Sequence, residues 1–210
     1  LIESLFFFFY LQLVNLSNEE EVPLDASVLK DMPYMSALAL KPAAQRSGLD
    51  VRTRVTVLCT GMTGEDGFEL LGPPSVLMSI SETLLEARDC TVQPAGLFCL
   101  DILRMEAGLP RVGADVPVGL YTPIRAALAW TLDQSKMRSH LMFGWQKLFF
   151  QLAKGPAFRR VGLLLDGPGH AGCRLLSNPH RQPVGVITSS SWSPALGCRV
   201  AQGYVKPEYA

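Results

Sequence analysis

The chain has 210 residues, of which 48% are hydrophobic and 18% are charged, and this composition indicates a folded globular protein. Lys and Arg (19 residues) balance Asp and Glu (19 residues), so the absence of a basic excess argues against a nucleic-acid-binding protein. The five cysteines contain no C-x-x-C pair, which indicates buried thiols in a reducing compartment. His170-x-x-Cys173 has a metal-like spacing, but its glycine- and proline-rich surroundings favour an ordinary loop.

Residues 1–14, LIESLFFFFYLQLV, form an apolar block that is shorter than the roughly 20 residues needed to span a membrane. Glu3 stands where a signal peptide carries basic residues, and no small-residue cleavage site follows. We therefore expect no membrane association. We expect a chain that starts inside a longer protein, with this block as a buried strand or a poorly defined edge. Residues 17–31 are predicted to form an acidic loop that enters a short helix, with Asp25 as its N-cap.

A β-hairpin is predicted next. Residues 51–59, VRTRVTVLC, alternate in polarity and are rich in β-branched residues, which is typical of a strand. TGEDG supplies the turn, with Asp66-Gly67 as the hairpin signal, and GFELL is the partner strand. Glu69 falls on this second strand, where a carboxylate is costly to bury. It is either an exposed strand residue or part of a binding site.

Two helices are predicted after the hairpin. Residues 75–89 carry apolar side chains at helical spacing, with Ser75 as a possible N-cap. The second helix is expected from about residue 96 to residue 107, where Gly108 ends it and Pro110 prevents its continuation.

The C-terminal third has a different pattern. From about residue 140, short apolar runs alternate with Gly, Pro, Ser and Asn, which is typical of a small antiparallel barrel or sandwich. We expect the domain boundary between residues 131 and 147.

Several short motifs occur in a fixed order along the chain. They are TGEDGFE (63–69), DILRMEAGL (101–109), TP (122–123), AWTL (129–132), RRVGL (159–163), VGVITS (184–189), SP (193–194) and GYV (203–205). From about Met32 to the C-terminal residue, this series resembles the T-protein of the glycine cleavage system, the tetrahydrofolate-dependent aminomethyltransferase family. Residues 1–31 match that family poorly.

The resemblance implies an α+β fold. A partial folate-binding α/β domain of the aminomethyltransferase type is expected over residues 1–135, followed by a small antiparallel β-barrel domain over residues 140–210 that lacks its last strand. The implied reaction transfers a one-carbon unit from the aminomethyl-lipoyl H-protein, the partner, to tetrahydrofolate with release of ammonia. Tetrahydrofolate enters as a substrate, and neither a metal nor a flavin is required. The implied compartment is the mitochondrial matrix in a eukaryote and otherwise the cytoplasm.

The resemblance also implies three folate-binding residues. Glu69 matches a glutamate that accepts two parallel hydrogen bonds from the ring N–H and the amino group of the pterin. Trp130 matches a tryptophan that packs beside the aminobenzoyl ring, and its alternative role is to fill the core between domains. Arg160 matches an arginine at the anionic glutamyl end, and its alternative is a surface arginine beside Arg159.

The chain departs from the family pattern at three positions and in one region. Leu100 replaces an arginine, Met62 a tyrosine, and Arg125 an acidic residue. The family's catalytic aspartate lies upstream of the residues matched here. We therefore assign no catalytic residue, and we expect these 210 residues alone to be inactive.

Alternative functions remain open. One is a folate-binding relative without transferase activity, such as the iron–sulfur maintenance protein of this fold, whose K-G-C-Y-x-G-Q-E stretch is absent near residues 143–147. Another is the folate-binding tail of a dimethylglycine or sarcosine dehydrogenase, which requires a flavin domain. The third is a degenerate binding or structural protein, in which Leu100 and the missing aspartate would be expected.

Overall fold

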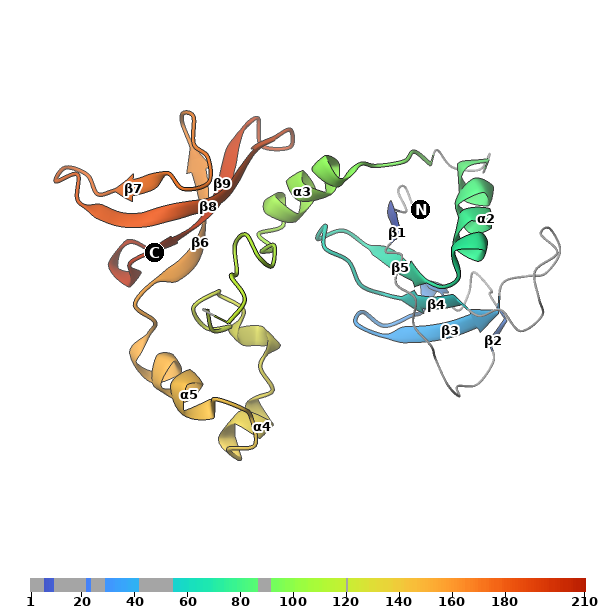
Figure 1. Cartoon of the computed structure of the whole chain (residues 1–210), viewed down its shortest axis with the longest axis horizontal. Coiled ribbons are helices and arrows are strands. Elements are labelled where there is room, and N and C mark those ends of the chain that lie inside the picture. Colours follow the sequence, from blue (N-terminus) through green and yellow to red (C-terminus); the bar gives the residue numbers. More distant parts are fainter. Residues whose placement is uncertain (1–5, 10–21, 24–28, 42–54, 87–91, 120) are drawn as a thin grey trace. The chain divides into compact units, whose positions relative to one another are not determined.

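The computed structural model describes residues 6–9, 22–23, 29–41, 55–86, 92–119 and 121–210. The chain divides into two compact units, Leu1–Leu97 and Phe98–Ala210 (Figure 1). No helix in these described ranges is both long enough and apolar enough to cross a membrane. The predicted N-cap Asp25 and the first residues of the predicted strand 51–59 lie outside the described residues.

The first unit contains a five-stranded mixed sheet in the order β1-β5-β4-β3-β2. β5 (Gly67–Leu71) pairs in parallel with β1 (Phe6–Phe9) and antiparallel with β4 (Val55–Leu58). β3 (Ala37–Lys41) pairs antiparallel with β4 and in parallel with β2 (Val22–Pro23). The strand that carries Glu69 therefore lies inside the sheet, with a hydrogen-bonded neighbour on each side.

The predicted hairpin is present, and residues 63–66 of the predicted TGEDG turn lie in its connection, but Asp66-Gly67 does not form a tight turn. Leu58 of β4 lies opposite Glu69 of β5, so a long connection joins the two strands. The left-handed residue of this connection is Gly64, with φ 77°, a conformation that glycine adopts without steric cost. Gly67 is already the first residue of β5. The assignment of the turn to Asp66-Gly67 is therefore wrong.

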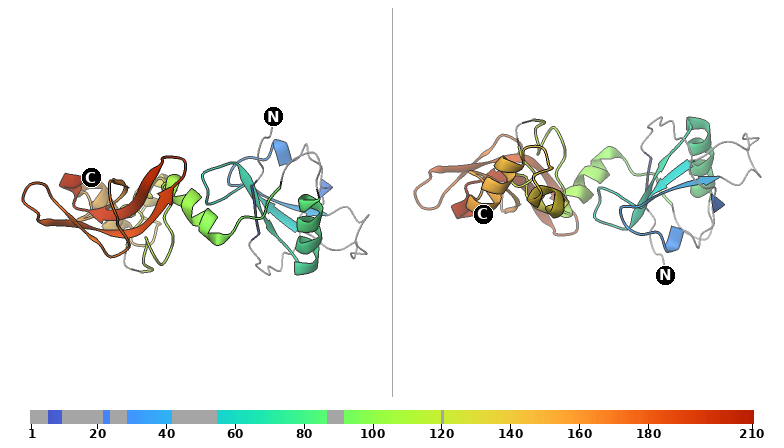
Figure 2. Two further views of the ribbon diagram at one scale, coloured as in Figure 1. Left: turned by 90° about the horizontal axis from the view of Figure 1, so that it is seen from above. Right: turned by 90° about the horizontal axis from the view of Figure 1, so that it is seen from below.

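α2 (Pro74–Leu85) packs on the sheet of the first unit, as both views of Figure 2 show. The prediction of a helix here is confirmed, but the N-cap is Pro73 rather than Ser75, and no side chain caps the helix. Pro74 at the first helical position loses nothing, because the backbone N–H there has no partner within the helix. The core beneath the helix consists of Val55, Val57, Leu70, Val76 and Leu77.

The second unit begins with the predicted helix α3 (Leu97–Glu106). Gly108 follows it with φ 71°, and the backbone N–H of Leu109 donates to the carbonyl of Arg104 at 2.8 Å. This left-handed glycine closes the helix in the way that the sequence predicted.

The sheet of the second unit has the order β6-β9-β8-β7 and is antiparallel throughout. Its strands are β6 (Arg159–Leu165), β7 (Arg174–Leu176), β8 (Pro183–Ser193) and β9 (Cys198–Val205). These four strands confirm the antiparallel β-domain predicted from the short apolar runs. Within the described residues, however, β6 and β7 are edges, and the sheet does not close into a barrel.

Two helices before this sheet were not predicted from the sequence, α4 (Gln134–Arg138) and α5 (Trp145–Lys154). The side chain of Asp133 caps α4 by accepting hydrogen bonds from the backbone N–H groups of Ser135 and Lys136. The apolar residues at positions 145, 148, 149 and 152 have the spacing of one helix face, so the signal for α5 was present. Leu148 of α5 packs with Ile124 and Met137 in a second core.

Candidate functional site

Glu69 is the sequence-predicted site residue of the first unit. It occupies the middle of β5, opposite Leu58 on one side and Phe8 on the other. Its side chain is partly buried, and no donor among the described residues bonds its carboxylate. A carboxylate in this setting can accept two parallel hydrogen bonds from a ligand.

Trp130 and Arg160 belong to the second unit. Trp130 lies in the short 3₁₀ helix Ala129–Thr131 and is 69% exposed, so the indole does not fill a core within its own unit. Arg160, the second residue of β6, is buried, while Arg159 beside it is exposed. The alternative that Arg160 is a surface arginine is therefore wrong.

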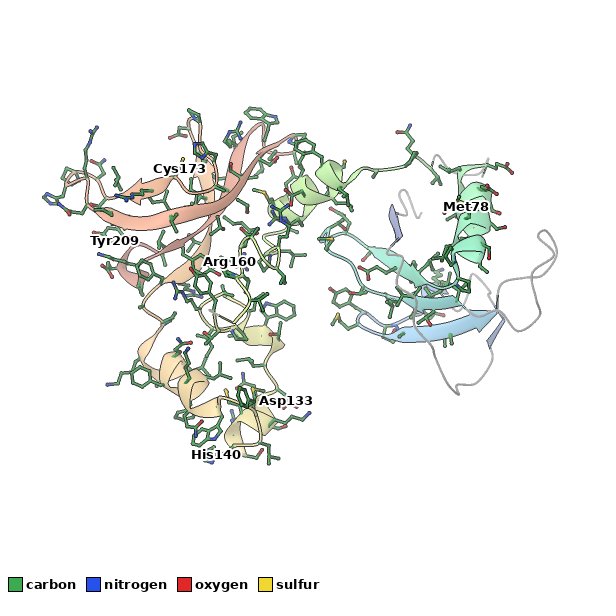
Figure 3. The ribbon with its side chains drawn as sticks, viewed as in Figure 1. Met78, Asp133, His140, Arg160, Cys173 and Tyr209 are labelled. Atoms are coloured by element: carbon green, nitrogen blue, oxygen red, sulfur yellow. The ribbon has the colours of Figure 1, made fainter. Side chains whose placement is uncertain are left out.

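The guanidinium of Arg160 joins three segments of its unit. Nε donates to the carbonyl of Ala126 at 2.7 Å, and Nη1 donates to the carbonyl of Gly108 at 2.8 Å and to Oε1 of Gln202 at 2.9 Å. Burial lowers the pKa of Arg160 from its ordinary value. Figure 3 shows Arg160 between the sheet and the loop that follows α3. Of the three guanidinium nitrogens of Arg160, only Nη2 has no acceptor among the described residues. The other two nitrogens stabilise the fold.

Asp115 is the polar centre of the second unit, and it is fully buried. Its Oδ2 accepts hydrogen bonds from Nη1 of Arg104 at 2.6 Å and from the backbone N–H of Arg111 at 2.9 Å. Its Oδ1 accepts from the hydroxyls of Thr188 and Ser189 on β8. Burial raises the pKa of Asp115, but the two hydroxyls, the Arg111 N–H and the Arg104 cation together hold the pKa below its usual value.

These bonds attach α3 and its following loop to the sheet of the second unit. Arg104 belongs to the DILRMEAGL motif but had no predicted role, and Asp115 was not predicted as a functional residue. The available signal was an arginine inside the apolar pattern of a predicted helix, since a buried arginine requires a carboxylate partner.

Tyr204 of β9 completes this network. Its hydroxyl donates to the backbone carbonyl of Asp115 at 2.8 Å, and its ring lies edge-on to Tyr121 with 4.6 Å between centroids. The side chain is 1% exposed, and burial raises the pKa of Tyr204 to about 12.

We expect the pKa of Tyr204 to lie at about 12, above the ordinary tyrosine value of 10.0. Because its pKa in the folded protein lies above the unfolded value of 10.0, its contribution to stability is complete below that value and is lost as the pH rises towards about 12. Ultraviolet absorbance titration of the wild type and of Tyr204→Phe measures this. A late ionisation step that persists in the phenylalanine variant assigns the step to another tyrosine.

Among the described residues, no three His, Cys, Asp or Glu side chains come together in a way that could hold a metal ion. His170 and Cys173 form a turn in which the backbone N–H of Cys173 donates to the carbonyl of His170 at 3.1 Å. His170 and Cys173 therefore lie in a turn, as their glycine- and proline-rich surroundings predicted.

Two family models match the chain. The GCVT N-terminal domain covers residues 26–136, more than half of the chain, and the glycine cleavage T-protein C-terminal barrel domain covers residues 159–210. The chain belongs to the glycine cleavage T-protein family. The resemblance found in the sequence and the predicted α+β class are confirmed by these matches and by the fold.

Known members of the T-protein family are similar over part of their length. The mitochondrial aminomethyltransferase of Flaveria trinervia is 36% identical over 147 residues, which are 70% of this chain and 36% of the relative. The mitochondrial aminomethyltransferase of Gallus gallus is 37% identical over 150 residues, 71% of this chain and 38% of the relative. The crystal structure of the glycine cleavage system aminomethyltransferase T from Bartonella henselae superposes with a TM-score of 0.71 at 31% identity. That match covers 86% of this chain and 46% of the crystallised one.

The chain therefore spans between a third and a half of the length of these T-protein relatives. The two family models leave their boundary between residues 136 and 159, whereas the compact units divide at residues 97 and 98. The physical reason is that α3 and its following loop pack on the C-terminal sheet through Asp115. The division into residues 1–135 and 140–210 stays a prediction.

Proposed function

We propose that this chain binds tetrahydrofolate and serves the aminomethyltransferase reaction of the glycine cleavage system. In that reaction tetrahydrofolate takes the one-carbon unit from the aminomethyl-lipoyl H-protein, and ammonia is released. Support comes from the aminomethyltransferases that match about 70% of the chain. The relatives are named mitochondrial, and we propose the same compartment for this chain if its source is a eukaryote.

The observation that carries the folate assignment is the carboxylate of Glu69. It lies partly buried on an interior strand and has no protein donor among the described residues. Its two oxygens match the adjacent N–H donors at the edge of a reduced pterin, and parallel charge-assisted bonds give both strength and orientation. Phe68 and Leu70 pack into the core beneath α2, so Glu69, between them on the strand, points to the opposite face of the sheet.

Trp130 and Arg160 are the other proposed contacts. The indole of Trp130 is exposed and offers a flat face to the aminobenzoyl ring. Arg160 offers only Nη2 to the glutamyl carboxylate, because its other donors bond to the protein. We assign no catalytic residue within these 210 residues. No residue of this chain is therefore proposed to transfer a proton to the folate.

Calorimetric titration of the chain with tetrahydrofolate tests the proposal. We expect saturable binding, and much weaker binding of N-(4-aminobenzoyl)-L-glutamate, which lacks the pterin that Glu69 holds. Binding is the quantity to measure, because the aligned part of the T-protein relatives is little more than a third of their length. The absence of saturable tetrahydrofolate binding would contradict the proposal and favour a degenerate, non-binding protein.

A further inference from the structure

We propose that Arg125 is the principal carboxylate-binding residue of the second unit and holds the anionic glutamyl end of the folate, to which Arg160 adds no more than its Nη2 contact. The inference rests on the proposed function for the identity of the ligand. The geometry itself points to any small carboxylate that can approach the Arg125 guanidinium.

Arg160 is poorly suited to this task. A carboxylate binds a guanidinium best through two neighbouring donors that point in the same direction. Each such pair on Arg160 includes Nε or Nη1, and both atoms already donate to protein acceptors. Only the two N–H groups of Nη2 are open to a ligand, so a bidentate contact would displace one of the hydrogen bonds that Nε and Nη1 make to the protein.

Arg125 lies beside Arg160 in the fold. Aromatic rings orient its guanidinium, but they do not accept hydrogen bonds from the N–H donors in its plane. The backbone carbonyl of Arg125 accepts a hydrogen bond from the backbone N–H of Arg160 at 3.0 Å. The Arg125 side chain lies over the ring of Tyr121, with 3.8 Å from Cζ to the ring centroid. The rings of Tyr204 and Phe158 follow at 5.5 and 5.6 Å. Stacking restrains the guanidinium plane but leaves its edge, where the N–H donors are, for an acceptor.

The side-chain donors of Arg125 have no acceptor among the described residues. Nε is buried and makes no hydrogen bond, which is an unfavourable state for a cationic donor, and an incoming carboxylate must bond to Nη1 and Nη2 because Nε is covered by the protein. No described carboxylate pairs with it, because Asp115 is bonded to Arg104, and Asp101 is shared by Arg104 and Arg111. The aromatic rings compensate part of the charge, but they supply no hydrogen-bond acceptor in the plane of the guanidinium. A ligand carboxylate supplies both the opposite charge and the acceptors.

The experiment compares three probes on the 210-residue protein: tetrahydrofolate, N-(4-aminobenzoyl)-L-glutamate, and 6-methyltetrahydropterin, which lacks the glutamyl tail. We expect Arg125→Gln to lower the affinity for the two ligands that carry a glutamyl group by about tenfold, the scale for losing one charged contact. The affinity for 6-methyltetrahydropterin should not change. Arg159→Gln is the matched control, because Arg159 is an exposed arginine adjacent to Arg160 in the sequence. This variant should bind all three probes like the wild type.

The possible failures are distinguishable. Unchanged affinity of Arg125→Gln for both glutamyl ligands overturns the inference, and so does an equal loss for 6-methyltetrahydropterin, which indicates a general structural effect. If neither pterin compound binds the wild type, the proposed function fails. Binding of N-(4-aminobenzoyl)-L-glutamate that depends on Arg125 then still supports the carboxylate site, and the absence of such binding overturns it.

A second measurement covers the case in which Arg125→Gln does not fold. In the wild type, the nitrogen-15 NMR resonance of the Arg125 Nε–H group should shift on addition of N-(4-aminobenzoyl)-L-glutamate, and Arg125→Lys assigns this resonance by its loss. A resonance that stays in place at saturating ligand overturns the inference.

Discussion

Replacement of Arg104 by alanine is expected to lower the free energy of unfolding of the C-terminal unit by about 3–5 kcal/mol, the range found when one partner of a buried ion pair is removed. Both side chains of the Arg104–Asp115 pair are fully buried, and Nη1 lies 2.6 Å from Oδ2. In the variant, the Asp115 carboxylate keeps the hydroxyls of Thr188 and Ser189 but loses its cation. Water cannot replace that cation at a buried position.

Urea unfolding followed by near-ultraviolet circular dichroism measures the effect of Arg104→Ala. Arg111→Ala is the matched control, because the Arg111 side chain is 51% exposed and its ion pair with Asp101 is worth at most about 1 kcal/mol. Equal losses in the two variants would show that burial does not determine the strength of these pairs. Since the folded-state pKa of Asp115 is lowered, its contribution is present above 3.8 and is lost as the pH falls through the folded-state value.

Replacement of Glu69 by glutamine is expected to weaken tetrahydrofolate binding by about 1–3 kcal/mol, or roughly 5- to 150-fold. Glutamine has nearly the same shape as glutamate, but its amide presents a donor where the pterin also presents donors. One of the two parallel bonds is therefore lost, together with the negative charge. The effect falls on ligand binding, because no described residue donates to this carboxylate in the protein itself.

Calorimetric titration of Glu69→Gln and the wild type tests this expectation. Glu65→Gln is the control, since Glu65 is an exposed carboxylate in the same connection between β4 and β5. We expect the control to bind like the wild type. Unchanged affinity in Glu69→Gln would remove Glu69 from the folate site, whereas an equal loss in both variants would indicate a general charge effect.

Local patterns predicted much of the secondary structure. α2 and α3 follow from apolar spacing and from Gly108, and the four C-terminal strands follow from short apolar runs between turn residues. The errors concern boundaries and short elements. Ser75 has the chemistry of an N-cap, but Pro73 and Pro74 set the start of α2, and the left-handed glycine of the connection between β4 and β5 is Gly64 rather than Gly67. Several local solutions are compatible with one short sequence, and packing selects among them.

The roles of the arginines illustrate why the candidate site was only partly predictable. Arg104, Arg125 and Arg160 have the same chemistry in the sequence, but one is paired with a buried carboxylate, one lies over aromatic rings, and one bonds to backbone and amide oxygens. The acceptors of Arg160 are 34, 52 and 42 residues away along the chain. No local pattern reports partners at such separations.

By itself, the sequence determined the T-protein family, the α+β class, and the strand on which Glu69 lies, because these depend on motifs and on periodicity within short segments. Only the tertiary structure decided that Arg160 is internal, that Asp115 anchors α3 to the C-terminal sheet, and that Arg125 has a restrained guanidinium without an acceptor among the described residues. The burial and the pairing of a charged group depend on which distant segments fold against it, and that information exists only once the chain is packed.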